Sequence, residues 1–341
     1  MKAVGGFVPR RFLLACAGTA TVSALALTGV ASLDGQSPPG SSGSASLVAA
    51  DPDGSIAELD VLPAAAGVPA VAVERVRASR PQLPGGGTRV FGHRRFLVAY
   101  YGTAGTASLG VLGEAPPDEI QHRLHLAAQP FKRKGEQIQT VYELIVTVVD
   151  PHPGADGDFS HDIATDHVRD YIEAAHRNGA LVVLDIQPGR ADFLTVAKRW
   201  AWALKDPWVG LALDPEWRMG PRQVPAQQIG SVGAAEVNRV SRWLARLTRD
   251  KGLPEKPFVL HQFRTTMIRD IESIVARPGL AMVQHADGFG NQAQKLATYH
   301  AIARPEQFTM GFKLFYDEDV HRFTPAQVRR IRPAIRFVSY Q

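Results

Sequence analysis

The sequence predicts an α/β fold: a (β/α)8 TIM barrel over residues 93–341, preceded by an export signal over 1–31 and a linker over 32–92. Three observations support this prediction. Short apolar segments alternate with amphipathic stretches, the connections between them are short, and about 250 residues are available, which is the usual size of this barrel. A doubly wound sheet is the alternative. It usually has fewer strands, and no glycine-rich phosphate fingerprint follows any of the segments.

The first residues have the charge pattern of an export signal. Lys2, Arg10 and Arg11 precede an uncharged run from Phe12 to Leu33, and Gly29-Val30-Ala31 supplies small residues for cleavage. The paired arginines also resemble a twin-arginine signal. We therefore expect a secreted or cell-envelope protein with no stable membrane insertion after cleavage. The alternative is an uncleaved N-terminal anchor, because 22 uncharged residues are enough to span a bilayer.

Composition narrows the classes of partner and chemistry. The net charge of +5 falls to +2 without the first 31 residues, which gives little reason to expect a nucleic-acid partner. The single cysteine, Cys16, lies in the export signal. The cleaved chain would then have no disulfide, no cysteine nucleophile and no cysteine-based metal site. Hydrophobic residues make up 45% of the chain and charged residues 21%, as in an ordinary globular protein.

The linker is marked by its composition. Residues 36–44 form a Ser, Gly and Pro tether, and residues 45–92 stay rich in Ala, Pro and Gly without a clear period. We expect it to be mostly extended, with room for a short segment that docks on the domain.

The body of the chain contains eight candidate strands and at least five candidate helices. Each strand is rich in Val, Leu, Ile, Phe or Tyr and too short for a core helix, whereas the helices have one apolar face. The strands are Phe96–Gly102, Val141–Asp150, Leu181–Gln187, Val209–Glu216, Phe258–Phe263, Leu280–Asp287, Met310–Asp317 and Ile335–Gln341, and the helices are His161–Asn178, Ala191–Lys205, Ala234–Asp250, Gln292–Ala303 and Thr324–Ile331.

The carboxyl ends of these strands are unusually polar. In a barrel these ends meet at one rim, where active sites lie. Their Asp, Glu, Gln, Tyr and His side chains suit a ligand rich in hydroxyl and amide groups, and Trp217 could stack on a sugar ring. The expected substrate-binding residues are Tyr100, Tyr101, Gln187, Trp217, His261, Gln284, His285, Asp287, Tyr316 and Tyr340.

Asp214 and Glu216 are the sharpest candidates for catalysis. Side chains alternate along a strand, so both would point the same way, with Gly210 and Ala212 below them. Two carboxyl groups this close cannot both ionise freely, so one pKa rises and that group can donate a proton. Asp185 would be a third acid on the neighbouring strand. The alternative is a structural role for the pair, bonding loop amides or Arg218.

A resemblance to a known family adds to this prediction. Gly210-x-x-Leu213-Asp214-x-Glu216 resembles the end of the fourth-strand signature of family 18 chitinases, and Gln284 is similar to a polar sixth-strand position there. The resemblance implies that Glu216 is the general acid and that Asp214 positions the substrate acetamido group, which acts as nucleophile. Val209 and Ala212 replace two of the family's aspartates. The segment also resembles, more weakly, the family 25 muramidases.

The remaining patterns argue against a metal site and a serine hydrolase, although His261 and His285, on neighbouring strand ends, leave a metal site as a lesser alternative. No His-x-His or His-Glu-x-x-His spacing is present, and no Gly-x-Ser-x-Gly elbow occurs. We therefore expect no metal and no cofactor. The predicted function is that of a monomeric glycosidase, a hydrolase of O-glycosyl bonds, that acts on a polysaccharide or cell-wall glycan. The alternative is a catalytically silent barrel that binds glycan or belongs to the cell envelope.

Overall fold

The structure is a computed structural model that describes residues 80–341. The predicted export signal and residues 32–79 of the predicted linker lie outside the described residues. Export and cleavage therefore stay predictions. Within the described part of the chain, no helix is both long and apolar enough to cross a membrane.

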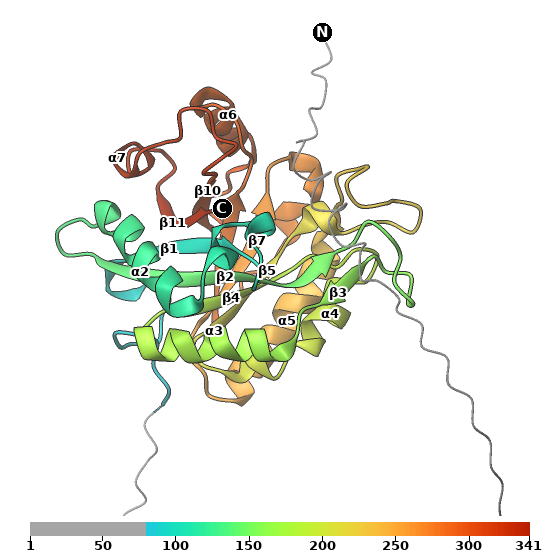
Figure 1. Ribbon diagram of the computed structural model, residues 1–341, viewed down its shortest axis with the longest axis horizontal. Coiled ribbons are helices and arrows are strands. Elements are labelled where there is room, and N and C mark those ends of the chain that lie inside the picture. The colour runs from blue at the N-terminus through green and yellow to red at the C-terminus, as the bar shows by residue number, and fades with distance from the viewer. Residues whose placement is uncertain (1–79) are drawn as a thin grey trace, which may run out of the picture. The chain divides into compact units, whose positions relative to one another are not determined.

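Eight parallel strands close into a barrel, which confirms the predicted fold (Figure 1). Neighbours in the barrel follow chain order, and the first strand pairs with both the second and the last. Every predicted strand is present. The strands are β1 (Arg95–Gly102), β2 (Gln137–Val149), β4 (Leu181–Ile186), β5 (Val209–Leu213), β7 (Lys256–Gln262), β9 (Leu280–Ala286), β10 (Thr309–Leu314) and β11 (Ile335–Tyr340).

Helices cover the outside of the barrel. In Figure 1, α3, α4 and α5 lie together on one side of the strands, and α6 and α7 lie on the other. The apolar faces of the helices pack against the outward side chains of the strands and form the larger core. The helices of residues 80–341 are α2 (Pro117–Ala128), α3 (Thr165–Asn178), α4 (Phe193–Arg199), α5 (Ala234–Asp250), α6 (Gln292–Ile302) and α7 (Pro325–Val328).

Local sequence signals explain where these helices begin and end. Asp192 accepts bonds from the first amides of α4, and Asn291 forms a capping box with Gln294 at α6. Gly179 ends α3 with a φ of 68°, a left-handed conformation that glycine adopts without strain.

Three details differ from the predicted elements. Residues 160–162 form β3 (Ser160–Asp162), which pairs antiparallel with β2, so α3 begins only at Thr165. Helix α2 occupies the first crossover, for which no helix was expected. The described crossover between β7 and β9 contains 3₁₀ turns, and its residues Ile268–Arg269 (β8) pair with Val232–Gly233 (β6).

The interior of the barrel is divided along its axis. Near the N-terminal ends of the strands, apolar side chains such as Leu97, Val183 and Phe337 form a second core. Leu83 and Val90, from the last part of the predicted linker, join this core. Arg95 holds that segment in place by donating hydrogen bonds to the carbonyls of Pro84 and Gly86. Because this end is filled by apolar packing, the opposite end is left for polar side chains.

Candidate functional site

The polar end of the barrel interior holds a cluster of titratable side chains. Seven inward side chains from six strands, or from the residue directly after a strand, contribute, and each is at most 7% exposed. They are Tyr101 (β1), Glu143 (β2), Asp185 (β4), His261 (β7), His285 (β9), Asp287 (after β9) and Lys313 (β10). Asp214 joins them from the residue after β5. This is the rim at which barrel enzymes place their active sites.

His261 lies at the centre of the cluster. Its Nε2 is 3.2 Å from Glu143 Oε1 and 3.9 Å from Asp185 Oδ1, and its Nδ1 is 3.2 Å from Asp287 Oδ2. Burial and the charge of Lys313 oppose protonation of the ring, but the close contacts with Asp287 and Glu143 outweigh them and raise the pKa of His261 well above its ordinary value. His261 is therefore an imidazolium ion held between carboxylates.

The same contacts keep two of the carboxylates ionised. Burial alone would raise the pKa of Glu143, but the close contact with His261 overrides it and lowers that pKa to about 2. The pKa of Asp287 is lowered as well, since His261 and Lys313 together outweigh the effect of burial. Lys313 Nζ is 4.0 Å from Asp287 Oδ2 and lies 3.4 Å from the centroid of the Tyr101 ring.

The acids on the third and fourth barrel strands behave in the opposite way. Burial and the charges of neighbouring carboxylates raise the pKa of Asp214 to about 8. Burial, followed by the charges of Asp214 and Asp287, raises the pKa of Glu216 well above its ordinary value. The pKa of Asp185 is raised mainly by burial, although Tyr101 donates a 2.7 Å bond to its Oδ2. At neutral pH the rim therefore holds protonated and ionised carboxyl groups side by side.

Asp214 and Glu216 reach this site by a route that differs from the predicted one. Strand β5 ends at Leu213, and Pro215–Trp217 form a 3₁₀ turn, so strand alternation does not set the direction of Glu216. Instead, Asp214 Oδ1 accepts a 3.3 Å bond from the backbone amide of Glu216. Asp214 is 3% exposed, whereas Glu216 is only partly buried. Glu216 is therefore the acid of the pair that solvent or a ligand can reach.

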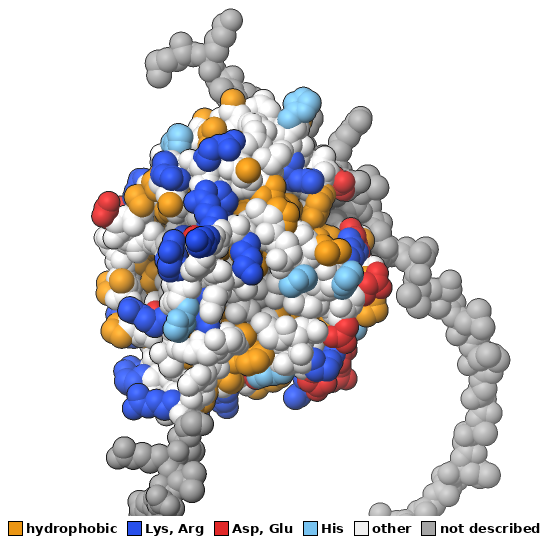
Figure 2. Space-filling model, turned by 90° about the vertical axis from the view of Figure 1, so that its left-hand side faces the viewer, with side chains coloured by type: hydrophobic (Ala, Val, Ile, Leu, Met, Phe, Trp, Pro, Cys, Tyr) orange, Lys and Arg blue, Asp and Glu red, His pale blue; other side chains and the backbone are white. Residues whose placement is uncertain are grey.

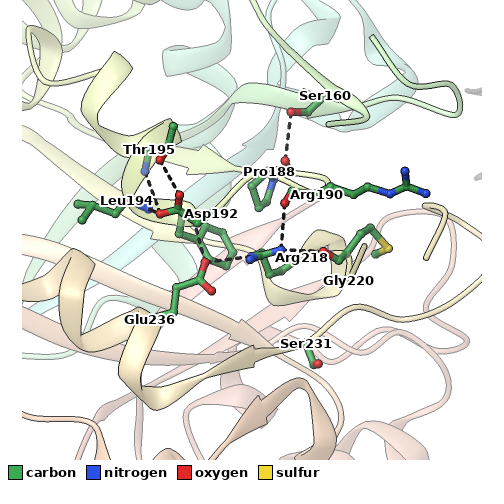
Figure 3. Close-up of polar contacts among 12 residues, drawn as sticks. Ser160, Pro188, Arg190, Asp192, Leu194, Thr195, Arg218, Gly220, Ser231 and Glu236 are labelled. Atoms are coloured by element: carbon green, nitrogen blue, oxygen red, sulfur yellow. Dashed lines mark hydrogen bonds and ion pairs between the residues drawn. The ribbon is translucent and has the colours of Figure 1, made fainter. Parts of the chain in front are cut away.

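Arg218 stabilises the 3₁₀ turn Pro215–Trp217. Its ion pair is with Glu236 and not with Asp214 or Glu216. Its Nε lies 2.9 Å from Glu236 Oε1 on α5, and its guanidinium also donates to the carbonyls of Arg190 and Met219 (Figure 3). Glu236 Oε1 in turn accepts a bond from the amide of Phe193, at the start of α4. This network ties the turn to two outer helices.

Gly230 also holds the backbone of this turn in place. Its amide donates a 2.6 Å bond to the carbonyl of Glu216. A Cβ at Gly230 would lie 2.6 Å from the carbonyl oxygens of both Glu216 and Arg218, so only glycine fits without moving the backbone. The long segment 218–232 thus packs directly against the turn that carries Glu216.

The structure does not bring every predicted site residue into the barrel. Tyr100 and Tyr340 belong to the outer core, and with Tyr316 they form an aromatic group outside the barrel in which the Tyr316 and Tyr340 rings stack at 5.2 Å. Gln284 also faces outward, where its amide bonds Gln262 and the Ile302 carbonyl. Trp217 is 4% exposed and so offers little surface for stacking on a sugar.

Gln187 lies at the edge of the cluster. Its Oε1 accepts a bond from the Val149 amide, and its Nε2 approaches the Tyr101 hydroxyl at 3.5 Å. It therefore links the first three strands of the barrel. Of the predicted substrate-binding residues, Tyr101, Gln187, His261, His285 and Asp287 lie in or beside the cluster.

Glu143 and Lys313 are members that the sequence-based set of site residues lacks. Glu143 lies in the middle of the thirteen-residue strand β2 and pairs in register with Tyr101. The signal for it was a single carboxylate within an otherwise apolar strand segment. Lys313 carried a similar signal near the end of β10, since a lysine is rarely buried without a partner.

Several carboxylate oxygens at the centre of the cluster could each accept a hydrogen bond that the structure does not supply. Both oxygens of Glu143, Asp185 Oδ1 and Asp287 Oδ1 are buried without a partner in hydrogen-bond geometry. Buried polar atoms of this kind are rare in folded proteins and call for an explanation, such as a catalytic role. Within residues 80–341, no group of His, Cys, Asp and Glu side chains has the arrangement of a metal site.

Comparison with known proteins does not assign the chain to a family. No protein-family model matches the sequence, and no curated protein matches it. The fold and the arrangement of the rim are therefore the basis for any functional assignment.

Proposed function

We propose that the protein is a glycoside hydrolase in which Glu216 donates a proton to the leaving group. The observation that carries this proposal is the separation of pKa values on one rim. Glu216 and Asp214 hold their protons at neutral pH, whereas Asp287 is ionised. Cleavage of a glycosidic bond needs one carboxylic acid and commonly one carboxylate, and environments that push two pKa values apart supply both.

Glu216 suits the role of the acid because it combines a raised pKa with access. Of the carboxyl groups with raised pKa on the rim, it is the one that is only partly buried. The turn that carries it is held by Arg218, Glu236 and Gly230, so its carboxyl group is presented on a fixed backbone. An acid held in this way can protonate the leaving oxygen without a large rearrangement.

Asp287 is the ionised carboxylate available to the reaction. His261 and Lys313 keep it charged, and its charge contributes to the raised pKa of Glu216. A carboxylate there can stabilise positive charge that develops on the sugar ring, or direct the group that attacks it.

The proposed substrate class is a polysaccharide or cell-wall glycan. Asp214 follows the fourth barrel strand, the position at which the sequence resembles the family 18 signature. A protonated Asp214 can donate a hydrogen bond to a substrate amide, as an acetamido sugar would require. Secretion follows from the predicted export signal and belongs to the same proposal.

Release of reducing ends tests this function. The full-length protein would be assayed on peptidoglycan, chitin oligomers and plant polysaccharides, beside Glu216→Gln and a control, Glu119→Gln, on the exposed face of α2. We expect Glu216→Gln to slow hydrolysis by about 10²–10⁴-fold, the usual contribution of a general acid. It should lose much less on a glycoside whose leaving group needs no proton. Glu119→Gln should change neither rate.

Two outcomes would reject the proposal. If Glu216→Gln hydrolyses a natural glycan at the wild-type rate, the proton donor is another group. If the wild type cleaves no glycan but binds one, the silent barrel is the better description of the protein.

A further inference from the structure

A second polar site lies near the opposite, N-terminal ends of the barrel strands. A cavity of about 280 Å³ opens there between the start of β1, the start of β11 and the segment before β2. Lys and Arg side chains gather on this side of the molecule (Figure 2). Six of the lining side chains are arginines, namely Arg94, Arg95, Arg133, Arg329, Arg332 and Arg336. We call this cavity the arginine pocket.

The positive charge of the arginine pocket is only partly balanced by the carboxylate that lines it. Glu136 is the one carboxylate among its lining residues, and it forms an ion pair with Arg329. The guanidinium groups of Arg95, Arg133, Arg332 and Arg336 bond to neutral carbonyl oxygens. Arg336 donates to the carbonyls of Phe91 and Arg95, and Arg133 donates to that of Arg329. These bonds orient the guanidinium groups but leave their charges in place.

Arg329 occupies the buried part of the arginine pocket. Its side chain is 8% exposed, and its guanidinium lies 4.1 Å from the centroid of the Phe96 ring. Its Nε is buried and has no hydrogen-bond acceptor in the structure. An unsatisfied donor on a buried cation is costly, because the group has lost water without gaining a partner.

Repulsion between the cations adds to this cost. The pKa of Arg329 is lowered by burial and by the charges of Arg133 and Arg336, although Glu136 opposes the shift. Burial likewise lowers the pKa of Arg336, and the charge of Arg94 contributes. A bound anion would relieve this repulsion and satisfy the free donor.

We propose that the arginine pocket binds a phosphate group. A carboxylate has two oxygens and is saturated by one or two guanidinium forks, whereas a phosphate offers more acceptor oxygens and a larger charge. Three of the arginines, Arg94, Arg133 and Arg332, are exposed and can close on an anion that enters from solvent. The phosphate can come from free phosphate or from a phosphodiester polymer. The inference does not depend on the proposed hydrolase activity.

Titration calorimetry on the full-length protein tests the proposal. The probes are inorganic phosphate, pyrophosphate and synthetic poly(glycerol phosphate), with acetate at equal ionic strength as the reference anion. Arg133→Gln and Arg332→Gln remove one charge each from exposed positions, so folding should survive. The matched control is Arg177→Gln, an exposed arginine on α3 whose partner is Asp118.

We expect saturable binding of the phosphate probes and little binding of acetate. Each pocket variant should weaken binding by about tenfold or more, as loss of a charge-assisted hydrogen bond does, and Arg177→Gln should bind as the wild type does. Tighter binding per phosphate of the polymer would identify a phosphodiester polymer as the source, and equal binding would identify free phosphate. Acetate binding equal to phosphate, equal losses in Arg177→Gln, or no saturable binding would overturn the proposal.

Discussion

Replacing Asp214 by Asn tests the electrostatics of the rim without relying on any substrate. Asp214 is 3% exposed, and its pKa is about 8 in the folded protein against an ordinary value of 3.8. The folded state therefore keeps a proton that the unfolded state releases. Where the folded state binds more protons, stability falls as pH rises, here between about pH 4 and pH 8.

The size of the effect follows from the shift. One pKa unit corresponds to about 1.4 kcal/mol, so at pH 7 holding this proton costs the folded state about 4 kcal/mol. Asn cannot ionise in either state and is free of this cost. Its Oδ1 can still accept the bond from the Glu216 amide, so the turn should be retained. Asp214→Asn should therefore be more stable than the wild type at pH 7 and lose that advantage near pH 4.

Urea unfolding of both proteins at several pH values from 4 to 8 measures this difference. The free energy of unfolding of the variant, relative to the wild type, should grow by about 1.4 kcal/mol per pH unit across that range. Stability curves that run parallel from pH 4 to pH 8 would refute the reasoning, since they would mean that Asp214 ionises normally in the folded protein.

The remaining predictions concern the pH profile, the turn and the barrel. If glycan is hydrolysed, Asp214→Asn should move the alkaline limb of the pH–rate profile to lower pH, because Asp214 ionises near pH 8 and its charge then raises the pKa of Glu216, an effect that Asn lacks. Gly230→Ala should destabilise the protein by about 1–3 kcal/mol in urea unfolding, since its Cβ would press on the Glu216 carbonyl; Gly154→Ala in an exposed turn is the control, and equal losses in both would contradict the steric argument. Deleting Ile335–Gln341 removes β11, which pairs with both β1 and β10, so thermal melts by circular dichroism should lose their cooperative transition; an unchanged melting temperature would be incompatible with a closed barrel.

The sequence predicted where polar residues lie along the strands but not which of their side chains face the barrel interior, because these strands are buried on both faces. Tyr100 and Tyr101 both end a fully buried strand, and no apolar–polar alternation tells which of the two faces the interior. The same ambiguity separates Gln284, which bonds outside the barrel, from His285, which lies within it. The sequence indicated a polar strand end in each case, and the position of the barrel axis selected the side chain.

The path of the acidic pair shows a second limit. The spacing of Asp214 and Glu216 was sufficient to predict that both lie at the rim, but not how Glu216 gets there. Pro215 has no amide to continue the sheet, and the Asp214 side chain bonds the Glu216 amide, so a 3₁₀ turn replaces the last residues of the strand. Local hydrogen bonding decided the geometry.

The sequence by itself determined the eight strands, their parallel order and the rim at which polar groups gather, because apolar periodicity and segment length are local properties of the chain. Only the tertiary structure decided which titratable side chains come into contact and so set one another's charge. Glu143 and His261 are 118 positions apart in sequence, yet they meet across the barrel, and their contact keeps Glu143 ionised. The arginine pocket likewise forms because closure brings the last strand beside the first. Charge and burial depend on such long-range contacts, which no local pattern encodes.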